Sequence, residues 1–431
     1  MTDQIRIGLL GCGTVGSGVV RILHREAKDI ASRLGAPLDV RRVGVRDLTK
    51  QRDLPLPSDV FTDDLESVVE SDDVDIVVEV MGGRDPAGEL IRRALELKKP
   101  VVTANKELVA HEGPELYDAA EAAGVDLVYE AAVAGAIPII KPLKESLAGD
   151  RIRRVVGILN GTTNYILTRM TEEGADYDEV LKDAQRLGYA EADPTADVGG
   201  HDAASKTAIL ASLAFDTRVH ADDVHRDGIE RVSAVDISVA DRLGYVIKLL
   251  GIASEVEGAI AARVHPTFLP KTHPLAAVRD SFNAIYVEAD AAGELMFYGR
   301  GAGSLPTGSA VVGDVIDVAR NLRQTARGPS ETAHTTKRIR PIDELRTQYY
   351  VLLDVEDTAG VLANVATTFG QHDVSIAQVW QEGAGDHAQL VLITHRAVER
   401  SLRETVEALA RTEGVRAVAN VLRVESEVFG S

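Results

Sequence analysis

The segment Ile5-Arg-Ile-Gly-Leu-Leu-Gly-Cys-Gly-Thr-Val-Gly16, continued by Ser17-Gly-Val-Val-Arg-Ile-Leu23, decides how the chain begins to fold. Its apolar first half predicts a buried strand, and the apolar spacing after Gly16 predicts a helix. Between them, Gly11, Gly13 and Gly16 form G-x-G-x-x-G in the strand–turn–helix order of a dinucleotide-binding site. The first glycine permits a tight turn, the second lets the backbone approach a pyrophosphate, and the third allows the helix to pack closely on the strand.

The start of the predicted helix is the expected phosphate site, because backbone N–H groups and the helix dipole both favour an anion there. We therefore expect five residues of this loop to contact the cofactor: Gly11, Gly13, Thr14, Val15 and Gly16. A tight turn that binds no ligand is the alternative interpretation.

The residues after the second predicted strand, Asp39–Val45, bear on the choice of cofactor. An acidic residue there binds a ribose 2′-hydroxyl, whereas an arginine accommodates a 2′-phosphate. Arg46 comes first, followed by Asp47 and Lys50. We therefore predict NADP with contacts from Arg46 and Lys50, while Asp47 leaves NAD possible and a solvent-exposed Arg46 is the alternative.

Further strands are predicted at Val74–Met81, Pro100–Lys106 and Val125–Glu130, with a helix at Pro86–Leu97. This alternation predicts a doubly wound parallel sheet, a Rossmann-type domain over residues 1–135. Ligands bind at the carboxyl ends of such strands, so we expect Lys106 to face the nicotinamide. An ion pair at a strand end is the alternative for this lysine.

Composition narrows the class of protein. A chain of 431 residues holds two or three domains at roughly 150 residues each. The net charge of −20 argues against nucleic acid and anionic membranes as partners, and no apolar run reaches the roughly 18 residues of a membrane span. A strand pattern begins almost at the first residue, so we expect no signal peptide.

Cys12 is the single cysteine, which rules out an intrachain disulfide and fits a reducing, cytoplasmic setting. It lies in the predicted phosphate loop, away from where a carbonyl substrate would bind. An acylating aldehyde dehydrogenase needs a thiolate at the substrate carbon, so that mechanism is excluded. Direct hydride transfer needs only a cofactor, orientation and a proton donor.

The stretch Leu187–Lys206 is rich in acids, glycine and proline and leads directly into an apolar helix. Asp202 and Lys206 are four residues apart at the start of that helix and share one face. Together with Glu191 they could hold a small zwitterion and move a proton. The alternative is a solvated acidic loop with an ordinary Asp–Lys pair.

This stretch, with Val101–Lys106, Glu130–Ile140 and Asn160–Leu167, resembles the homoserine dehydrogenases over residues 5 to about 320. The resemblance implies interconversion of L-aspartate 4-semialdehyde and L-homoserine with NAD(P)H, in threonine and methionine biosynthesis. It also implies a role for each polar residue. Glu191 and Asp202 bind the substrate and its amino group, Lys206 donates the proton, and Lys106 is the second catalytic lysine.

The same resemblance implies an α+β substrate-binding and dimerisation domain over residues 136–320, whose last helix returns to the cofactor domain. Gly188 and Gly303 would line the cofactor. A sodium site would lie in an irregular segment, with the side-chain carboxylate of Glu130 and the backbone carbonyls of Val133, Gly135 and Ile137 as its ligands. Oxygen ligands suit a hard cation. The aspartate kinase that precedes the first strand in fused relatives is not expected.

A polar linker is predicted at 321–347, followed by βαββαβ, a ferredoxin-like pattern, over 348–426. The segment Asp357–Asn364 resembles the turn of an ACT domain, a module that senses amino acids. Feedback by an effector such as L-threonine is therefore a hypothesis, and a dimerisation module that binds nothing is its alternative. Pairing of such sheets between subunits favours a homodimer or homotetramer.

Two other functions remain open. One is a non-catalytic sensor of cofactor and amino acid, and the other is a dehydrogenase for a different small hydroxy acid. A sensor would not be expected to retain the set Lys106, Glu191, Asp202 and Lys206, and all four are present.

Overall fold

The computed structural model describes residues 4–329, 335–383 and 388–425. Linker residues 330–334 and residue 426, the predicted end of the ACT module, lie outside this range. The chain divides into two compact units. The first comprises residues 1–155, 205–223 and 283–337, and the second comprises 156–204, 224–282 and 338–431. Among the described residues, no helix combines the length and apolar character needed to cross a membrane.

The first unit contains a six-stranded parallel sheet, which confirms the predicted Rossmann fold. Its strands follow the order β3 (Phe61–Thr62), β2 (Leu38–Gly44), β1 (Ile5–Leu10), β4 (Ile76–Glu79), β5 (Val101–Thr103) and β6 (Leu127–Val128). The order reverses between β1 and β4, and ligands of such sheets bind at that switch point.

Helices cover both faces of this sheet, because its strands carry apolar side chains on both sides. Ile7 and Leu9 belong to one core cluster, whereas Leu10 belongs to the other. The first face is covered by α1 (Thr14–Arg25), α2 (Ala27–Leu34) and α11 (Ser304–Gln324), and the second by α3 (Leu65–Glu70), α4 (Ala87–Glu96) and α5 (Lys106–Ala123).

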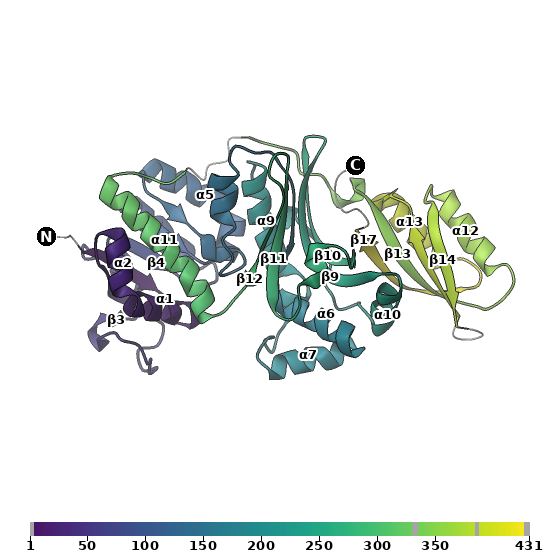
Figure 1. Cartoon of the computed structure of the whole chain (residues 1–431), viewed down its shortest axis with the longest axis horizontal. Coiled ribbons are helices and arrows are strands. Elements are labelled where there is room, and N and C mark those ends of the chain that lie inside the picture. The colour runs from purple at the N-terminus through teal and green to yellow at the C-terminus, as the bar shows by residue number, and fades with distance from the viewer. Residues whose placement is uncertain (1–3, 330–334, 384–387, 426–431) are drawn as a thin grey trace. The chain divides into compact units, whose positions relative to one another are not determined.

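Helices α1 and α11 lie side by side, with their backbones in contact (Figure 1). A Cβ atom on Gly18 would lie 2.0 Å from the carbonyl oxygen of Ser304, and one on Gly308 would lie 2.9 Å from the carbonyl carbon of Gly18. Any side chain at either position would separate the helices. α11 ends at Gln324, so the first four residues of the predicted linker are helical.

In the second unit, two long strands form an antiparallel hairpin, β9 (Tyr245–Val256) and β10 (Ala259–Pro270). Glu257 and Gly258 connect them with φ of +53° and +76°, as a two-residue type I′ turn requires. The sequence analysis did not predict this hairpin. Before its C-terminal part, this unit contains helices α6 (Gly161–Glu173), α7 (Tyr177–Arg186), α8 (Thr195–Val198) and α10 (Ala234–Arg242).

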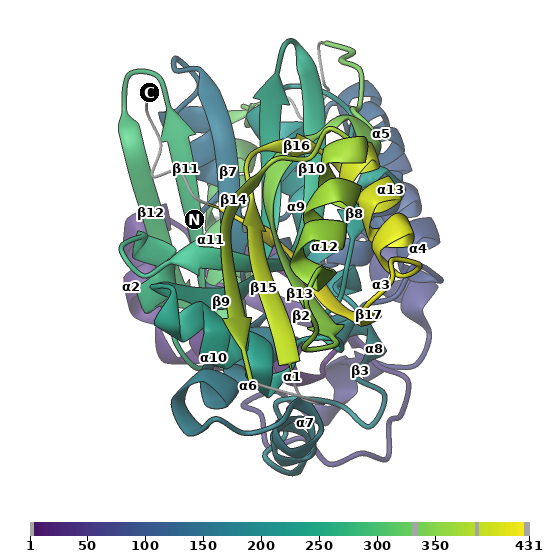
Figure 2. The same ribbon diagram turned by 90° about the vertical axis from the view of Figure 1, so that its right-hand side faces the viewer.

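The C-terminal part confirms the predicted βαββαβ order (Figure 2). It consists of β13 (Arg346–Val355), α12 (Val361–Gln371), β14 (Ile376–Glu382), β15 (Ala388–Thr394), α13 (Glu399–Leu409) and β17 (Val415–Val424). The predicted linker therefore ends at Leu345, two residues early. Apolar residues of α12 and α13 pack together on one face of the antiparallel sheet β17-β13-β15-β14.

Strand β17 also pairs in parallel with β10, so the ACT sheet continues the hairpin sheet. The Glu425 amide donates to the Phe268 carbonyl at 2.9 Å, and the Phe268 and Tyr350 rings stack with centroids 4.4 Å apart. Arg423 of β17 is half-buried and lies between Glu399 of α13, also half-buried, and the exposed Asp227, with both N–O distances 2.7 Å. Two ion pairs therefore accompany the strand pairing.

Replacing Arg423 with alanine is expected to lower the free energy of unfolding by about 1–2 kcal/mol, because the half-buried Glu399 loses its charged donor. Urea unfolding followed by fluorescence of Trp380, the single tryptophan, measures this loss. Arg400→Ala, at an exposed position of α13, should cost less than about 0.5 kcal/mol. Equal stability of the two variants would contradict the role of Arg423.

Candidate functional site

The phosphate loop has the geometry that its three glycines predict. Gly11 has φ +98°, a left-handed conformation, and a Cβ on Gly16 would lie 2.2 Å from the Gly11 carbonyl oxygen. A Cβ on Gly13 would meet nothing within 4 Å. Gly13 precedes Thr14 and Val15, the first residues of α1, and no side chain caps that helix. Its first N–H groups are therefore available to a ligand.

A cavity of about 430 Å³ lies beside this loop and is rich in basic side chains. Its lining includes Thr14, Ser17, Arg21, Lys50 and Arg52. Lys50 was predicted from the sequence, whereas Arg46 is exposed on the loop after β2 and does not line the cavity.

Arg21 and Arg52 were missed by the sequence analysis. Arg52 donates to the carbonyl oxygens of Asp47 at 3.0 Å and Lys50 at 2.9 Å, and it lies over the Phe61 ring. These contacts hold its side chain at the cavity. Arg21 is seven residues after Thr14, so the helical repeat would have placed it on the same face of α1.

A buried acid, Glu79, connects the carboxyl ends of β4 and β5 through its hydrogen bonds. Glu79 accepts hydrogen bonds from the amides of Met81 at 2.7 Å and Gly82 at 3.2 Å, and from the Thr103 hydroxyl at 2.6 Å. Burial raises the pKa of this carboxyl against the effect of those bonds. The signal in the sequence was an acid inside the apolar run Val74–Met81.

Lys106 lies at this edge of the sheet, but the prediction that it ends a strand is wrong. β5 ends at Thr103, and Lys106 is the first residue of α5. The helix begins there because the Asn105 side chain caps it, accepting from the Leu108 amide at 3.1 Å and donating to the Gly83 carbonyl at 2.6 Å. Lys106 is half-buried at the helix N-terminus.

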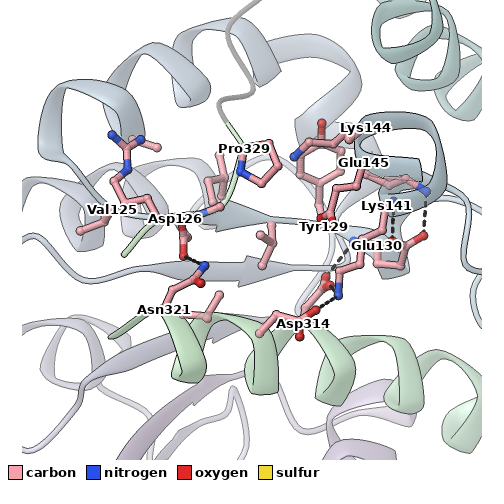
Figure 3. Close-up of a pocket in the computed structure, with 18 of the residues that line it drawn as sticks. Val125, Asp126, Tyr129, Glu130, Lys141, Lys144, Glu145, Asp314, Asn321 and Pro329 are labelled. Atoms are coloured by element: carbon pink, nitrogen blue, oxygen red, sulfur yellow. Dashed lines mark hydrogen bonds and ion pairs between the residues drawn. The ribbon is translucent and has the colours of Figure 1, made fainter. Parts of the chain in front are cut away.

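Glu130 lies between β6 and α11 (Figure 3). Its carboxylate accepts three backbone N–H bonds, from Ile139 at 2.6 Å, Ile140 at 2.8 Å and Lys141 at 3.0 Å. Its own amide donates to Asp314 of α11 at 2.8 Å. Glu130 therefore fixes the segment that follows it. The adjacent cavity of about 400 Å³ is lined by Tyr117, Asp126, Lys144, Asp314 and Asn321, among others.

The backbone after Glu130 is irregular, with φ of +54° at Ala134 and +58° at Gly135. A Cβ on Gly135 would lie 2.5 Å from the Gly301 carbonyl oxygen, which explains the glycine. Val133, Gly135 and Ile137 are buried, and within residues 4–329 no hydrogen bond ends on their carbonyl oxygens. No cluster of three or more histidine, cysteine or acidic side chains suited to a metal occurs among the described residues.

The substrate residues predicted from Leu187–Lys206 lie in different surroundings. Asp202 and Lys206 are 9% and 8% exposed on α9 (His201–Ala214). Glu191 is exposed in the loop before α8. Gly188, with φ +78°, lies two residues after the end of α7, and Gly303, with φ +124°, directly precedes α11.

Asn160 is a polar residue of this region that the sequence analysis did not single out. It is buried at the start of α6, and its amide nitrogen lies 2.7 Å from Asp197 and 2.9 Å from Asp202. No local pattern pointed to it, because its partners are 37 and 42 residues away.

Three family models match the chain. The model described as homoserine dehydrogenase matches residues 138–316, that of the homoserine dehydrogenase NAD binding domain matches 11–130, and the ACT domain model matches 349–414.

Individual proteins match over nearly the whole chain. The homoserine dehydrogenase of Corynebacterium glutamicum is 52% identical over 99% of this chain and 96% of its own. The crystal structure of a homoserine dehydrogenase from Thiobacillus denitrificans superposes with a TM-score of 0.94 at 41% identity, covering 98% of this chain and 99% of that one. A hyperthermophilic archaeal homoserine dehydrogenase in complex with NADPH matches with a TM-score of 0.64 at 26% identity, over 76% and 99%.

Substituting alanine at two loop glycines should separate folding from ligand binding. Gly16→Ala is expected to lower the melting temperature, because its Cβ would meet the Gly11 backbone. Gly13→Ala meets no protein atom and should melt like the wild type, yet weaken NADPH binding about tenfold or more by blocking the phosphate approach. Fluorescence titration with NADPH tests this, and unchanged affinity in Gly13→Ala would contradict the assigned loop.

Asp314 should make stability depend on pH. Burial raises its pKa to about 6, although Lys141 and the Glu130 amide oppose the shift. Between pH 4 and 6 the folded state therefore keeps a proton that the unfolded state has lost, so stability falls as pH rises through this window.

Relative to Asp314→Asn, the wild type should lose up to about 3 kcal/mol in free energy of unfolding between pH 4 and 6.5. The matched control is Asp317→Asn, on the same helix and more exposed, which should retain the wild-type slope. Parallel curves for wild type and Asp314→Asn would show that this carboxyl is not responsible.

Proposed function

The chain belongs to the homoserine dehydrogenase family, and from this premise we propose how its own residues bind cofactor and substrate and move the proton. The enzyme is an NAD(P)-dependent oxidoreductase that interconverts L-aspartate 4-semialdehyde and L-homoserine. The bound nicotinamide supplies or accepts the hydride. The remaining tasks are binding, orientation and proton transfer by the protein.

We assign substrate binding and proton transfer to four side chains. Glu191 and Asp202 bind the substrate ammonium, Lys206 donates a proton to the aldehyde oxygen, and Lys106 is the second cation at the reacting carbon. The observation that carries this assignment is the start of α9, where Asp202 and Lys206 are both buried one turn apart. Lysine and aspartate are rarely buried without a specific role or partner.

The proposed direction of proton transfer follows from ordinary lysine chemistry. The protonated ammonium group of Lys206 can donate a proton to the alkoxide that forms as the aldehyde is reduced. In the oxidative direction the same nitrogen must accept the proton, which desolvation and a second nearby cation favour. Lys106 at the N-terminus of α5 would supply that cation.

We propose NADP as the preferred cofactor, with NAD as the weaker one. The pyrophosphate would lie at the uncapped start of α1, against Gly11, Gly13, Thr14, Val15 and Gly16. Three cations, Arg21, Lys50 and Arg52, line the cavity beside this loop and would favour the additional phosphate of NADP. Arg46 would reach the same ligand only from the exposed loop after β2, and Gly188 and Gly303 would border the cofactor.

We propose that a monovalent cation, sodium, binds the backbone carbonyls of Val133, Gly135 and Ile137 together with that of Glu130. The residues fit such an ion, because the first three carbonyls are buried and accept no hydrogen bond within residues 4–329. The Glu130 side chain would organise the site rather than bind the ion, since its oxygens already accept three N–H bonds.

We propose a homo-oligomer, a dimer or tetramer, with a contact through β12 (Gly293–Arg300). This strand is at the edge of the order β12-β11-β7 and exposes Met296 and Tyr298.

For the ACT module we propose an amino-acid effector such as L-threonine at the start of α12. Gly360, with φ +99°, begins that helix without a side-chain cap.

Lys206→Ala should reduce kcat by roughly 10²–10⁴-fold, because the proton donor is lost. NADPH and NADH oxidation with L-aspartate 4-semialdehyde measures it, and NADPH binding should be unchanged. Lys182→Ala, on the exposed side of α7, is the matched control and should keep wild-type rates. Turnover of Lys206→Ala at the control rate would contradict the assignment, and a preference of the wild type for NADH would contradict the cofactor assignment.

A further inference from the structure

Asn160 occupies the N-cap of α6, and this position fixes the orientation of its side chain. Its Oδ1 accepts hydrogen bonds from the Thr163 amide at 2.9 Å and the Thr163 hydroxyl at 3.1 Å. Because the oxygen faces the helix, the Nδ2 group must point away from it. The opposite orientation would aim N–H groups at the Thr163 amide, which is itself a donor.

The Nδ2 group donates both of its hydrogens to acids of the substrate region. One goes to Asp197 Oδ1 at 2.7 Å, from α8, and the other to Asp202 Oδ2 at 2.9 Å, from α9. Asn160 is only 5% exposed, so these bonds form in a water-poor environment where they are stronger than in solvent. One amide therefore holds two carboxylates in a single arrangement.

The helix that carries Asn160 is itself anchored. Asn164, one turn along α6, donates to the Phe282 carbonyl at 3.1 Å and accepts from the ammonium of Lys248 at 2.9 Å. Lys248 is buried on β9. The cap position, and with it the amide of Asn160, is therefore held from the hairpin sheet.

The group that holds the two acids is an uncharged amide, which leaves their negative charge in place. A lysine or arginine at this position would also hold two carboxylates, but its positive charge would cancel the negative charge that attracts a substrate ammonium. An amide supplies two N–H groups without adding a positive charge, so the acid pair keeps its attraction for a cation.

We propose that Asn160 is a positioning residue that holds Asp202, jointly with Asp197, in the geometry that binds the substrate ammonium. The proposal deepens the proposed function, since it rests on Asp202 as a substrate-binding residue. It assigns Asn160 no contact with the substrate. Because the acids are fixed before the substrate arrives, substrates with a free α-ammonium group should bind more tightly than substrates without one.

Asn160→Ser separates this role from helix capping. Serine is a good N-cap, so α6 should persist, but it cannot supply two N–H groups to two carboxylates. We expect the KM for L-homoserine to rise about tenfold or more, with kcat changed far less and NADPH affinity unchanged. Calorimetric titration of the NADP complex with L-homoserine should show the same loss of affinity.

A pH profile provides a readout that a purely structural role would not move. In Asn160→Ser, the acid limb of the pH dependence of kcat/KM for L-homoserine should shift upward by about one unit, because the carboxylates lose a donor that stabilises their charged form. The titratable groups beside Asp202 on α9 are His201, which precedes it, and Lys206, one turn further along; the charges of Arg226 and Glu230 act on His201. Burial, followed by the charge of Arg226, lowers the pKa of His201.

Asp64→Ala, which removes the N-cap of α3 in the cofactor fold, is the control for a lost cap. It should lower the melting temperature while leaving the KM for L-homoserine and its pH profile unchanged. Asn160→Asp should keep the cap, place a third carboxylate beside the pair and impair L-homoserine binding more than serine does.

The outcomes separate this proposal from the proposed function. If the wild type does not turn over L-homoserine, or Asp202→Asn leaves its KM unchanged, the assignment of Asp202 fails and the proposal fails with it. If Asp202→Asn raises the KM but Asn160→Ser moves neither the KM nor the acid limb, the function stands and the positioning role is overturned. The positioning role is also overturned if Asn160→Ser lowers the melting temperature but leaves the KM and the acid limb unchanged, because Asn160 would then act only as a helix cap.

Discussion

The contact between α1 and α11 is the constraint on which most of the first unit depends. Only glycine at positions 18 and 308 allows these helices to touch through their backbones. The contact brings a helix from residue 304 onward against the helix that follows the phosphate loop. Segments almost 300 residues apart in sequence therefore form one folded unit.

Helix α11 also helps to hold the proposed cation loop in place. Asp314 accepts the Glu130 amide, and the Glu130 carboxylate then orders the chain from Ile139 to Lys141. The loop between them is also held from the turn before α11, because Gly135 lies against the Gly301 backbone. The phosphate loop and the cation loop thus depend on the same helix, so a change in its packing is expected to affect both.

The second unit is organised by buried polar groups and strand pairing. Asn160 joins two acids, while Arg423 joins the ACT sheet to Asp227. Two residues after Asp227, the Ile229 amide donates to the Val198 carbonyl at the end of α8. The ACT strand and the acid pair therefore belong to one continuous hydrogen-bonded framework.

Sequence reasoning worked where the physical cause is local. The glycine pattern predicted the phosphate loop, and the pattern after the linker predicted the βαββαβ order of the ACT module. It failed for the hairpin β9–β10, because strands buried on both faces lack alternation, and only the turn Glu257-Gly258 marked it. It also placed Lys106 in a strand, because an N-cap depends on the hydrogen bonds of Asn105, which the apolar pattern does not reveal.

Taken alone, the sequence determined the element types, the Rossmann and ACT folds, and the chemical groups available for hydride and proton transfer. These follow from side-chain periodicity and from glycine conformations, which act over a few residues. Tertiary structure decided which polar groups meet. Glu130 binds amides nine to eleven residues ahead, Asn160 binds acids 37 and 42 residues away, and Asp314 reaches the Glu130 amide across 184 residues. Buried polar groups must find partners, and the topology of the folded chain determines which partners come within reach.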